Sequence, residues 1–166
     1  MLLRKYEETD AIKILSWIDS ERAFRLWSAD RYGDYPITED DVNDNYRQCA
    51  QNGDFYPMTL IDDNENIVGH LILRKSDKYS NVIRLGFIIV DNKIRGRGYG
   101  KLMIKCAIDY AKNKLNAKEI SLGVFKNNES AYKCYCSVGF KEVEIEKSAY
   151  IFYEESWDCI EMILKE

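Results

Sequence analysis

The chain has 166 residues, of which 46% are hydrophobic and 31% are charged. This length and balance suit one soluble domain with its own core, so the sequence predicts a single domain over residues 1–166. The formal net charge of −4 disfavours nonspecific binding to nucleic acid and suits a cationic partner. No run of residues approaches the ~20 apolar residues of a membrane-spanning helix.

The amino terminus and the cysteines both favour a cytoplasmic location. The opening segment, MLLRKYEETD, is too polar for a signal peptide. The cysteines are odd in number and include no CxxC pair, so reduced thiols are expected. Because Cys134 and Cys136 would point in different directions on a helix, we expect no metal site.

Two helices are predicted in the first third of the chain. Apolar residues at helical spacing predict one over residues 10–18, with Thr9 or Asp10 as its cap. A second begins near Thr38, which forms a capping arrangement with Asp41. The segment between them is expected to be an aromatic loop that either packs over the sheet or grips substrate, and it contains Trp27, Tyr32, Tyr35 and Pro36.

The rest of the chain alternates strands and helices. Period-two alternation from residue 56, broken by the turn DDNEN, predicts a hairpin that ends near residue 73. The elements predicted after it are a strand over 82–90, a helix over 100–115, a strand over 119–125, a helix over 129–137 ended by Gly139, and strands near 141–146 and 157–164. The long helix is expected to bury Leu102, Met103, Cys106, Ala107, Tyr110 and Ala111. This order predicts an α/β (α+β) fold with a mostly antiparallel, partly parallel sheet.

The segment RGRGYG, residues 95–100, joins a predicted strand to a predicted helix. Glycines let a ligand approach the backbone, and the free N–H groups at a helix amino terminus attract anions. A P-loop is excluded because Leu102 follows Lys101 where a hydroxyl residue is required. The alternating glycines also depart from the dinucleotide-binding fingerprint. The segment therefore predicts a phosphate-bearing ligand of another kind.

Two ordered motifs resemble the GNAT N-acetyltransferase family. Arg95, Gly98 and Gly100 are similar to that family's acetyl-CoA loop. A second block, NESAYKCYCSVGF, resembles its closing motif, which is matched by Asn128, Ala131, Tyr135, Gly139 and Phe140. The resemblance implies a central mixed, mostly antiparallel sheet of about six to seven strands flanked by about four helices.

The resemblance also implies a site for acetyl-CoA as cosubstrate. The pantetheine arm would pair with the backbone of a strand, and the pyrophosphate would lie on the glycine loop. The residues expected to bind the cofactor are Ile88, Ile89, Val90, Arg95, Gly96, Arg97, Gly98, Tyr99, Gly100, Lys101, Asn128, Ala131 and Tyr135. Tyr135 is the expected catalytic residue, because a phenol with a pKa near ~10 can protonate the departing thiolate.

The general base is not evident in the sequence. Members of the family that carry a glutamate on either of two strands would place it at positions that here are Arg84 and Gly123. Arg84 either holds a substrate carboxylate or is an exposed strand arginine, and the second role is expected. Weak candidates for a base lie in the last part of the chain, namely Glu154, Glu155 and Asp158. His70 is expected to be structural.

The expected function is transfer of acetyl from acetyl-CoA to a primary amine by direct attack in a ternary complex. The acceptor is a peptide amino terminus, a lysine side chain, a polyamine or an aminoglycoside-like amine, and a general likeness to enzymes that modify protein amino termini favours the first. The alternative is a CoA-binding or acyl-CoA-binding sensor without turnover. A nucleic-acid contact of the glycine turn is disfavoured by the acidic net charge. Edge strands near the carboxyl end make a homodimer possible.

Overall fold

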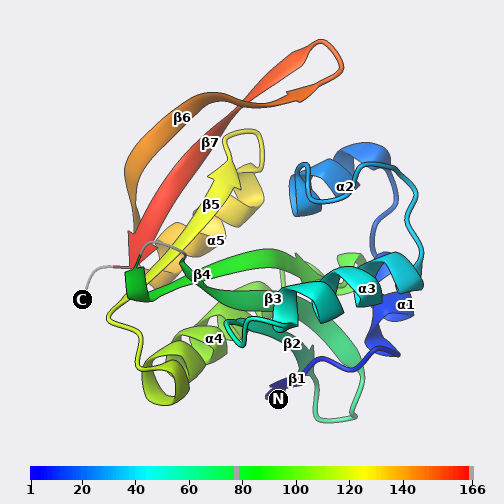
Figure 1. Ribbon diagram of the computed structural model, residues 1–166, viewed down its shortest axis with the longest axis vertical. Helices are drawn as coiled ribbons and strands as arrows, with labels where there is room; N and C mark the ends of the chain where they lie inside the picture. Colours follow the sequence, from blue (N-terminus) through cyan, green and yellow to red (C-terminus); the bar gives the residue numbers. More distant parts are fainter. Residues whose placement is uncertain (77–78, 165–166) are drawn as a thin grey trace.

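The computed structural model describes residues 1–76 and 79–164, so the predicted domain end at residue 166 lies outside the described residues. These residues form a seven-stranded sheet with the order β1-β2-β3-β4-β5-β7-β6 (Figure 1). Its strands are β1 (Leu2–Lys5), β2 (Phe55–Ile61), β3 (Ile67–Ser76), β4 (Tyr79–Val90), β5 (Glu119–Phe125), β6 (Phe140–Phe152) and β7 (Glu155–Leu164). All neighbouring strands are antiparallel except β4 and β5.

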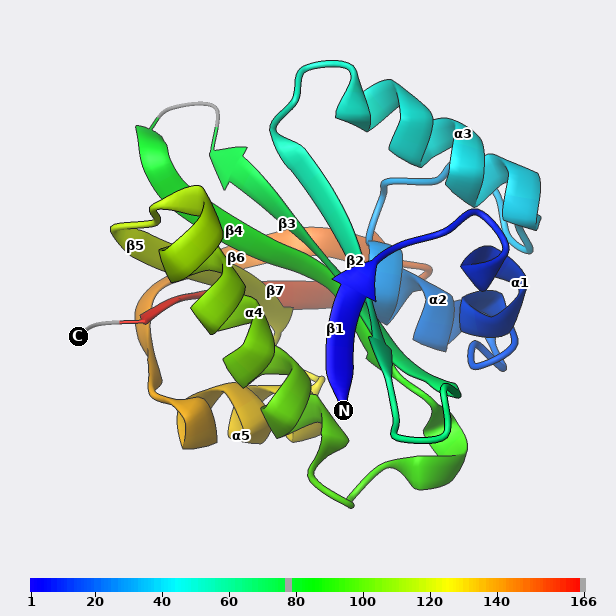
Figure 2. The same cartoon turned by 90° about the horizontal axis from the view of Figure 1, so that it is seen from below.

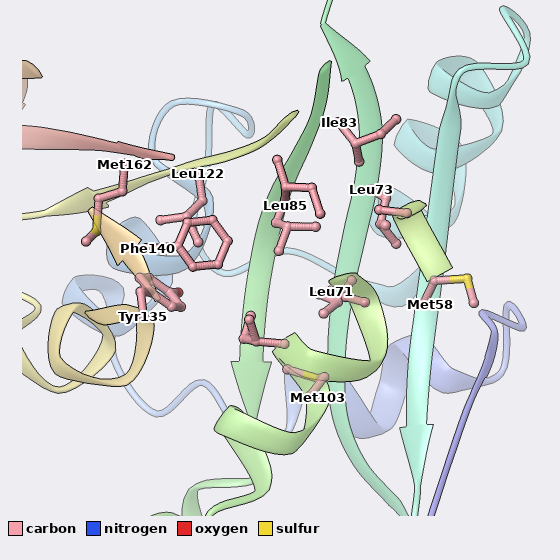
Figure 3. Packing of buried hydrophobic residues seen from close by; sticks show 14 of the residues in the cluster. Met58, Leu71, Leu73, Ile83, Leu85, Met103, Leu122, Tyr135, Phe140 and Met162 are labelled. Atoms are coloured by element: carbon pink, nitrogen blue, oxygen red, sulfur yellow. The ribbon is translucent and has the colours of Figure 1, made fainter. Parts of the chain in front are cut away.

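Helices cover both faces of the sheet (Figure 2). They are α1 (Asp10–Leu15), α2 (Glu21–Ser28), α3 (Glu39–Ala50), α4 (Tyr99–Leu115) and α5 (Glu129–Val138), with a 3₁₀ turn, η1 (Asn92–Ile94). Alternation along β3 divides the core, because Leu71 and Leu73 face α4 and α5 whereas Ile72 belongs to the cluster of α1, α2 and α3. In Figure 3, Met103 of α4 lies against the first of these two clusters.

The predicted fold class is confirmed, and most element boundaries agree with the expectation. The capping box of Thr38 and Asp41 opens α3, and Gly139 ends α5 with a φ of 115°. Three local expectations were wrong. Trp27 lies in α2 rather than in a loop, Thr9 makes no side-chain cap, and α1 ends at Leu15.

The side chain of Asp10 caps no helix because it is used elsewhere. Its carboxylate accepts two hydrogen bonds from Arg4, at 2.8 Å each, and one from the Thr59 hydroxyl at 2.7 Å. These bonds fasten the start of α1 to β1 and β2. Burial opposes a low pKa at Asp10, but the pKa is lowered because these hydrogen bonds and one from the Glu7 N–H, at 3.0 Å, together outweigh the effect of burial.

The buried stripe of α4 is shifted from the predicted one. Ile104 is fully buried whereas Leu102 is 37% exposed, while Met103, Ala107 and Ala111 are buried as expected. Ile104 also lines a cavity described below. Apolar periodicity does not distinguish a residue that lines a cavity from a residue that packs in the core.

Strands β4 and β5 pair over a short stretch and then separate. Their parallel register covers only Val82–Arg84 against residues 119–121. Beyond it, β5, β7 and β6 turn away from the rest of the sheet (Figure 1). The separation opens the sheet next to the carboxyl end of β4, and two cavities lie there.

The long β6–β7 hairpin reaches across to α2. Arg22 of α2 pairs with Glu155 at 2.7 Å, and its guanidinium lies 5.2 Å from the ring centroid of Trp157. Tyr153 donates to Glu21 at 2.8 Å. These contacts join the two sides of the opening between β4 and β5. Strand β6 is an edge of the sheet and carries exposed Val143, Ile145 and Ile151.

Candidate active site

A cavity of about 520 Å³ lies at the end of β4. It is enclosed by β4, the loop before α4, the first turns of α5, and α2. Every residue expected to bind the cofactor lines it except Arg97. The charged residues of its lining are all cationic, namely Arg95, Lys101 and Lys133. A cavity of this size and charge suits an elongated, phosphate-bearing ligand.

The glycine loop turns sharply into α4. Gly96 and Gly98 have φ values of 80° and 86°, a left-handed conformation that residues with a Cβ rarely adopt. Gly98 is the N-cap, and the first hydrogen bond of the helix runs from the Leu102 N–H to the Gly98 carbonyl at 3.0 Å. The N–H groups before Leu102 therefore remain available to an anion.

Strand β4 carries a bulge beside the cavity. The register with β3 passes from Gly86 to Ile89, so Phe87 and Ile88 have no partner residue in it. Phe87 has a φ of 49°, and its carbonyl accepts a hydrogen bond from Trp27 Nε1 at 2.9 Å. A bulge leaves backbone groups outside the ladder. In this bulge the unpaired backbone groups lie at the wall of the cavity, which Ile88 lines.

Helix α5 presents Tyr135 to this cavity. Tyr135 is 6% exposed, and its ring contacts that of Phe140 with centroids 6.3 Å apart (Figure 3). Burial raises the pKa of Tyr135 well above its usual range, so the phenol keeps its proton at neutral pH. Asn128 and Ala131 lie on the preceding turns and line the same wall. The Asn128 side chain does not cap α5.

A second cavity of about 220 Å³ adjoins the first. The two cavities share Leu26, Trp27, Ile88, Asn128 and Tyr135 as lining residues. The smaller one extends between β4 and β5, and its charged lining residues are Arg31, Arg74 and Arg84. Asp, Glu and His are absent from the described lining of both cavities.

Arg84 forms a two-pronged ion pair that the sequence did not predict. Its Nη1 and Nη2 lie 2.6 and 2.8 Å from the two carboxylate oxygens of Glu161 on β7. The hydrogen bonds to Glu161 raise the pKa of Arg84. The expectation of an exposed strand arginine was therefore wrong. The antiparallel register sets Gly123 opposite Glu161.

Gly123 makes the space for this ion pair. A Cβ at position 123 would lie 2.6 Å from Arg84 Nη2 and 2.9 Å from Glu161 Oε1. Some members of the family carry a glutamate at the position of Gly123. In this chain the carboxylate of Glu161, from the neighbouring strand β7, lies beside that position. Glycine opposite glutamate in paired strands was the available signal, but the pairing of β5 with β7 is not evident from local sequence.

The carboxylates considered as bases lie outside both cavities. Glu155 pairs with Arg22, and Asp158 accepts from Lys147 at 2.8 Å, so hydrogen bonds from these cations lower the pKa values of both carboxyls. Glu154 is exposed and lines neither cavity. No group of three or more potential metal ligands among His, Cys, Asp and Glu occurs in the described residues.

His70 is structural, as expected. It is fully buried on the face of β3 opposite Leu71, and its Nε2 lies 2.8 Å from the Tyr46 hydroxyl. Burial lowers the pKa of His70 to about 3, which keeps the imidazole neutral. Tyr32 also serves packing, since its ring stacks near Trp27 and Phe87 and lines neither cavity.

The wall contributed by α2 and the segment before it was not predicted. Its lining residues are Trp17, Ile18, Ala23, Leu26 and Trp27. The signal was present in the sequence, because the Ser20 side chain accepts from the Ala23 N–H and caps α2. No helix in the described part of the chain is both long and apolar enough to cross a membrane.

Solved structures with the same fold include spermidine N-acetyltransferases of Vibrio cholerae. One, in complex with CoA and spermine, superimposes with a TM-score of 0.83 and 21% identity over 98% of this chain and 93% of that chain. A chimera of that enzyme with hSSAT gives a TM-score of 0.81 and 20% identity over 99% of this chain and 95% of the other. At these identities the similarity establishes the fold.

Sequence comparisons assign the family. A stretch of 60 residues is 42% identical to an uncharacterised N-acetyltransferase of Methanocaldococcus jannaschii, covering 36% of this chain and 26% of that protein. The profile of the acetyltransferase (GNAT) family matches residues 20–140, which include both motifs and most of the lining of the two cavities. The chain therefore belongs to the acetyltransferase (GNAT) family, a family of acyltransferases that use acetyl-CoA.

Proposed function

We propose that this protein transfers the acetyl group of acetyl-CoA to a primary amine by direct attack in a ternary complex. The observation that supports this most strongly is the wall shared by the two cavities, which includes Ile88, Asn128 and Tyr135. A thioester in the larger cavity and an amine in the smaller one would meet at this wall, already positioned for reaction.

The larger cavity is the proposed cofactor site. The pyrophosphate would accept hydrogen bonds from the free N–H groups of the glycine loop, with Arg95 and Lys101 adding positive charge. Arg97 remains a proposed contact only at the outer rim, because it does not line the cavity. The thioester carbonyl would lie against the bulged backbone near Ile88, whose N–H groups stabilise the oxyanion.

Tyr135 is the proposed acid for the departing thiolate. Burial raises the pKa of Tyr135, so a proton is available at neutral pH. The phenol would donate a hydrogen bond to the departing CoA thiolate, whose conjugate acid has a pKa near ~8.5 if the cysteine thiol is taken as a guide, and so stabilise the leaving group. Ala131 leaves room beside the phenol for the cofactor arm.

The cysteines near the site favour direct attack over a covalent enzyme intermediate. Cys134 lines the larger cavity, and burial raises the pKa of its thiol. Cys159 lines the smaller one, and burial raises its pKa to about 11. A protonated thiol is a poor nucleophile, and the chain's single histidine, His70, lies outside both cavities.

The cofactor site is tested by calorimetric titration of the protein with acetyl-CoA and CoA. We expect micromolar binding that is lost in Gly98→Glu, which places a carboxylate against the pyrophosphate. Gly53→Glu is the matched control, because Gly53 has a similar φ of 71° and an added side chain there meets no neighbour within 4 Å. Absence of binding by the folded wild type, or equal loss in both variants, would contradict the proposed site.

The role of Tyr135 is tested by Tyr135→Phe in an assay of CoA release. We expect kcat to fall by about 10²–10⁴-fold with little change in acetyl-CoA affinity, because only the proton donor is removed. Tyr132→Phe, on the same helix but outside both cavities, should retain activity. A wild type that binds acetyl-CoA but acetylates no amine would instead favour the sensor.

A further inference from the structure

We propose that the acceptor amine carries a carboxylate, which is bound by Arg84 in the smaller cavity. This inference rests on the proposed function, since it assigns the smaller cavity to the acceptor. It goes further by naming a substrate class and a residue that selects it. It also replaces the expectation, drawn from net charge alone, of a cationic partner.

The charge of the lining is the first argument. Arg31, Arg74 and Arg84 come from a loop, β3 and β4, and the described lining of this cavity includes no carboxylate. A polyamine placed there would bring further positive charge against guanidinium groups. An amine with a carboxylate places opposite charges together, and guanidinium groups bind carboxylates with two parallel hydrogen bonds.

The unused donors of Arg84 are the second argument. A guanidinium has five N–H groups, and the hydrogen bonds of Arg84 within the described residues use two of them, both on Glu161. The other donors belong to a side chain that lines the cavity, whereas Glu161 does not line it. Glu161 therefore acts as a positioning residue that binds the guanidinium of Arg84 outside the cavity lining. Gly123 leaves room for this ion pair because it has no side chain.

The size of the cavity is the third argument. Arg84 and Tyr135 both line a space of only about 220 Å³, so one small molecule can reach both. Its amine would lie at the wall shared with the cofactor cavity, and its carboxylate would lie toward Arg84. Arg74, which is engaged in an interaction of its own, is the cross-strand partner of Arg84 and adds to the positive lining.

The test compares matched acceptors. ω-Amino carboxylates of increasing length, from glycine to aminohexanoate, are each assayed beside the corresponding carboxamide, and spermidine is included as a polycationic amine. Each carboxamide keeps the amine but changes the pKa of that amine, so kcat/KM is expressed per neutral amine. The ratio of these values between carboxylate and carboxamide then isolates recognition of the anion. We expect the best member of the series to show a ratio of at least about 10.

Variants assign that ratio to Arg84. The double variant Arg84→Gln with Glu161→Gln removes both charges together and leaves no uncompensated partner, so it is expected to fold. Its carboxylate preference should fall to near unity, while acetyl-CoA affinity by calorimetry stays unchanged. Glu161→Gln alone keeps Arg84 but weakens the contact that positions it, so it should lower the preference without abolishing it. The control is Arg47→Gln with Asp44→Asn, an exposed ion pair on α3, which should change neither quantity.

The outcomes separate this inference from the proposed function. Turnover that favours carboxamides or spermidine, or a carboxylate preference that survives in the double variant, would overturn the inference and leave the acetyltransferase proposal intact. Acetyl-CoA binding without turnover of any acceptor would also overturn it. Failure to bind acetyl-CoA at all would overturn the proposed function, and the inference with it.

Discussion

The single histidine of the chain makes its burial measurable as a dependence of stability on pH. In the unfolded chain the pKa of His70 is near its ordinary value of 6.5, whereas in the folded protein it is about 3. Between these pH values the unfolded chain binds a proton at His70 and the folded protein does not. The contribution of His70 to the free energy of unfolding is therefore fully present above pH ~6.5 and is lost as the pH falls toward the folded pKa. We expect the free energy of unfolding to decrease by up to about 1.4 kcal/mol per pH unit in this window.

The measurement is urea denaturation of the wild type and His70→Gln between pH 7 and 5. The variant should be less stable at pH 7 but should show a flatter dependence, because it has no imidazole to protonate. The paired carboxylates Asp10, Asp41 and Asp158 have lowered pKa values and so contribute little change in this range. Parallel curves for the two proteins would contradict the buried, neutral state of His70.

The absence of acidic and imidazole side chains from the described cavity linings predicts a simple pH–rate profile. Only a neutral amine attacks a thioester, and water rather than a side chain would remove the proton. The value of kcat/KM for the amine should therefore rise about tenfold per pH unit up to the pKa of the acceptor itself. Stopped assays with two acceptors of different pKa would check this. A break near pH 5–7 common to both acceptors would indicate an enzymic base.

At the level of elements, the contact between α2 and the β4 bulge is expected to hold the site together. Trp27 donates its indole N–H to the Phe87 carbonyl, whereas the indole nitrogen of buried Trp17 has no hydrogen-bond partner among the described residues. Trp27→Phe should therefore destabilise the protein by about 1 kcal/mol more than Trp17→Phe, because only the first change leaves a carbonyl unpaired. Thermal and urea denaturation of both variants measure the difference; equal losses would contradict the role of this bond.

Elements governed by local patterning were predictable from the sequence. The strand Glu119–Phe125 and the capped start of α3 follow from alternation and from a side-chain cap, which need only neighbouring residues. Helix α2 was missed because its aromatic residues resemble those of a packed loop. The extension of β6 to Phe152 was missed because most of that strand is exposed and lacks a clear pattern.

The site divides in the same way. The two motifs predicted the residues of the larger cavity, since the glycine loop and the Asn128–Tyr135 spacing are local features. The Arg84–Glu161 pair joins residues 77 positions apart, and it depends on the pairing of β5 with β7. Tertiary contacts of this kind leave no local pattern, so the smaller cavity could not be described from the sequence.

At the scale of the whole molecule, the sign of the net charge differs from the sign of the charge that lines the cavities. The protein carries a net charge of −4, yet the charged residues in the described lining of the cofactor and acceptor cavities are all cationic. The far field of such a molecule repels anions, while the near field at the openings attracts them, and the Debye length of about 10 Å at 0.1 M salt separates the two regimes.

This separation has a consequence for the rate at which a polyanionic cofactor arrives. Added salt screens the long-range repulsion first. The association rate constant for acetyl-CoA should therefore decrease less with ionic strength than it would for a protein of positive net charge that attracts the cofactor over long distances. Stopped-flow association over 20–300 mM salt, in the wild type and in Lys101→Gln, would measure this balance. The protein would then capture its cofactor by local attraction at the opening and not by the field of the whole molecule.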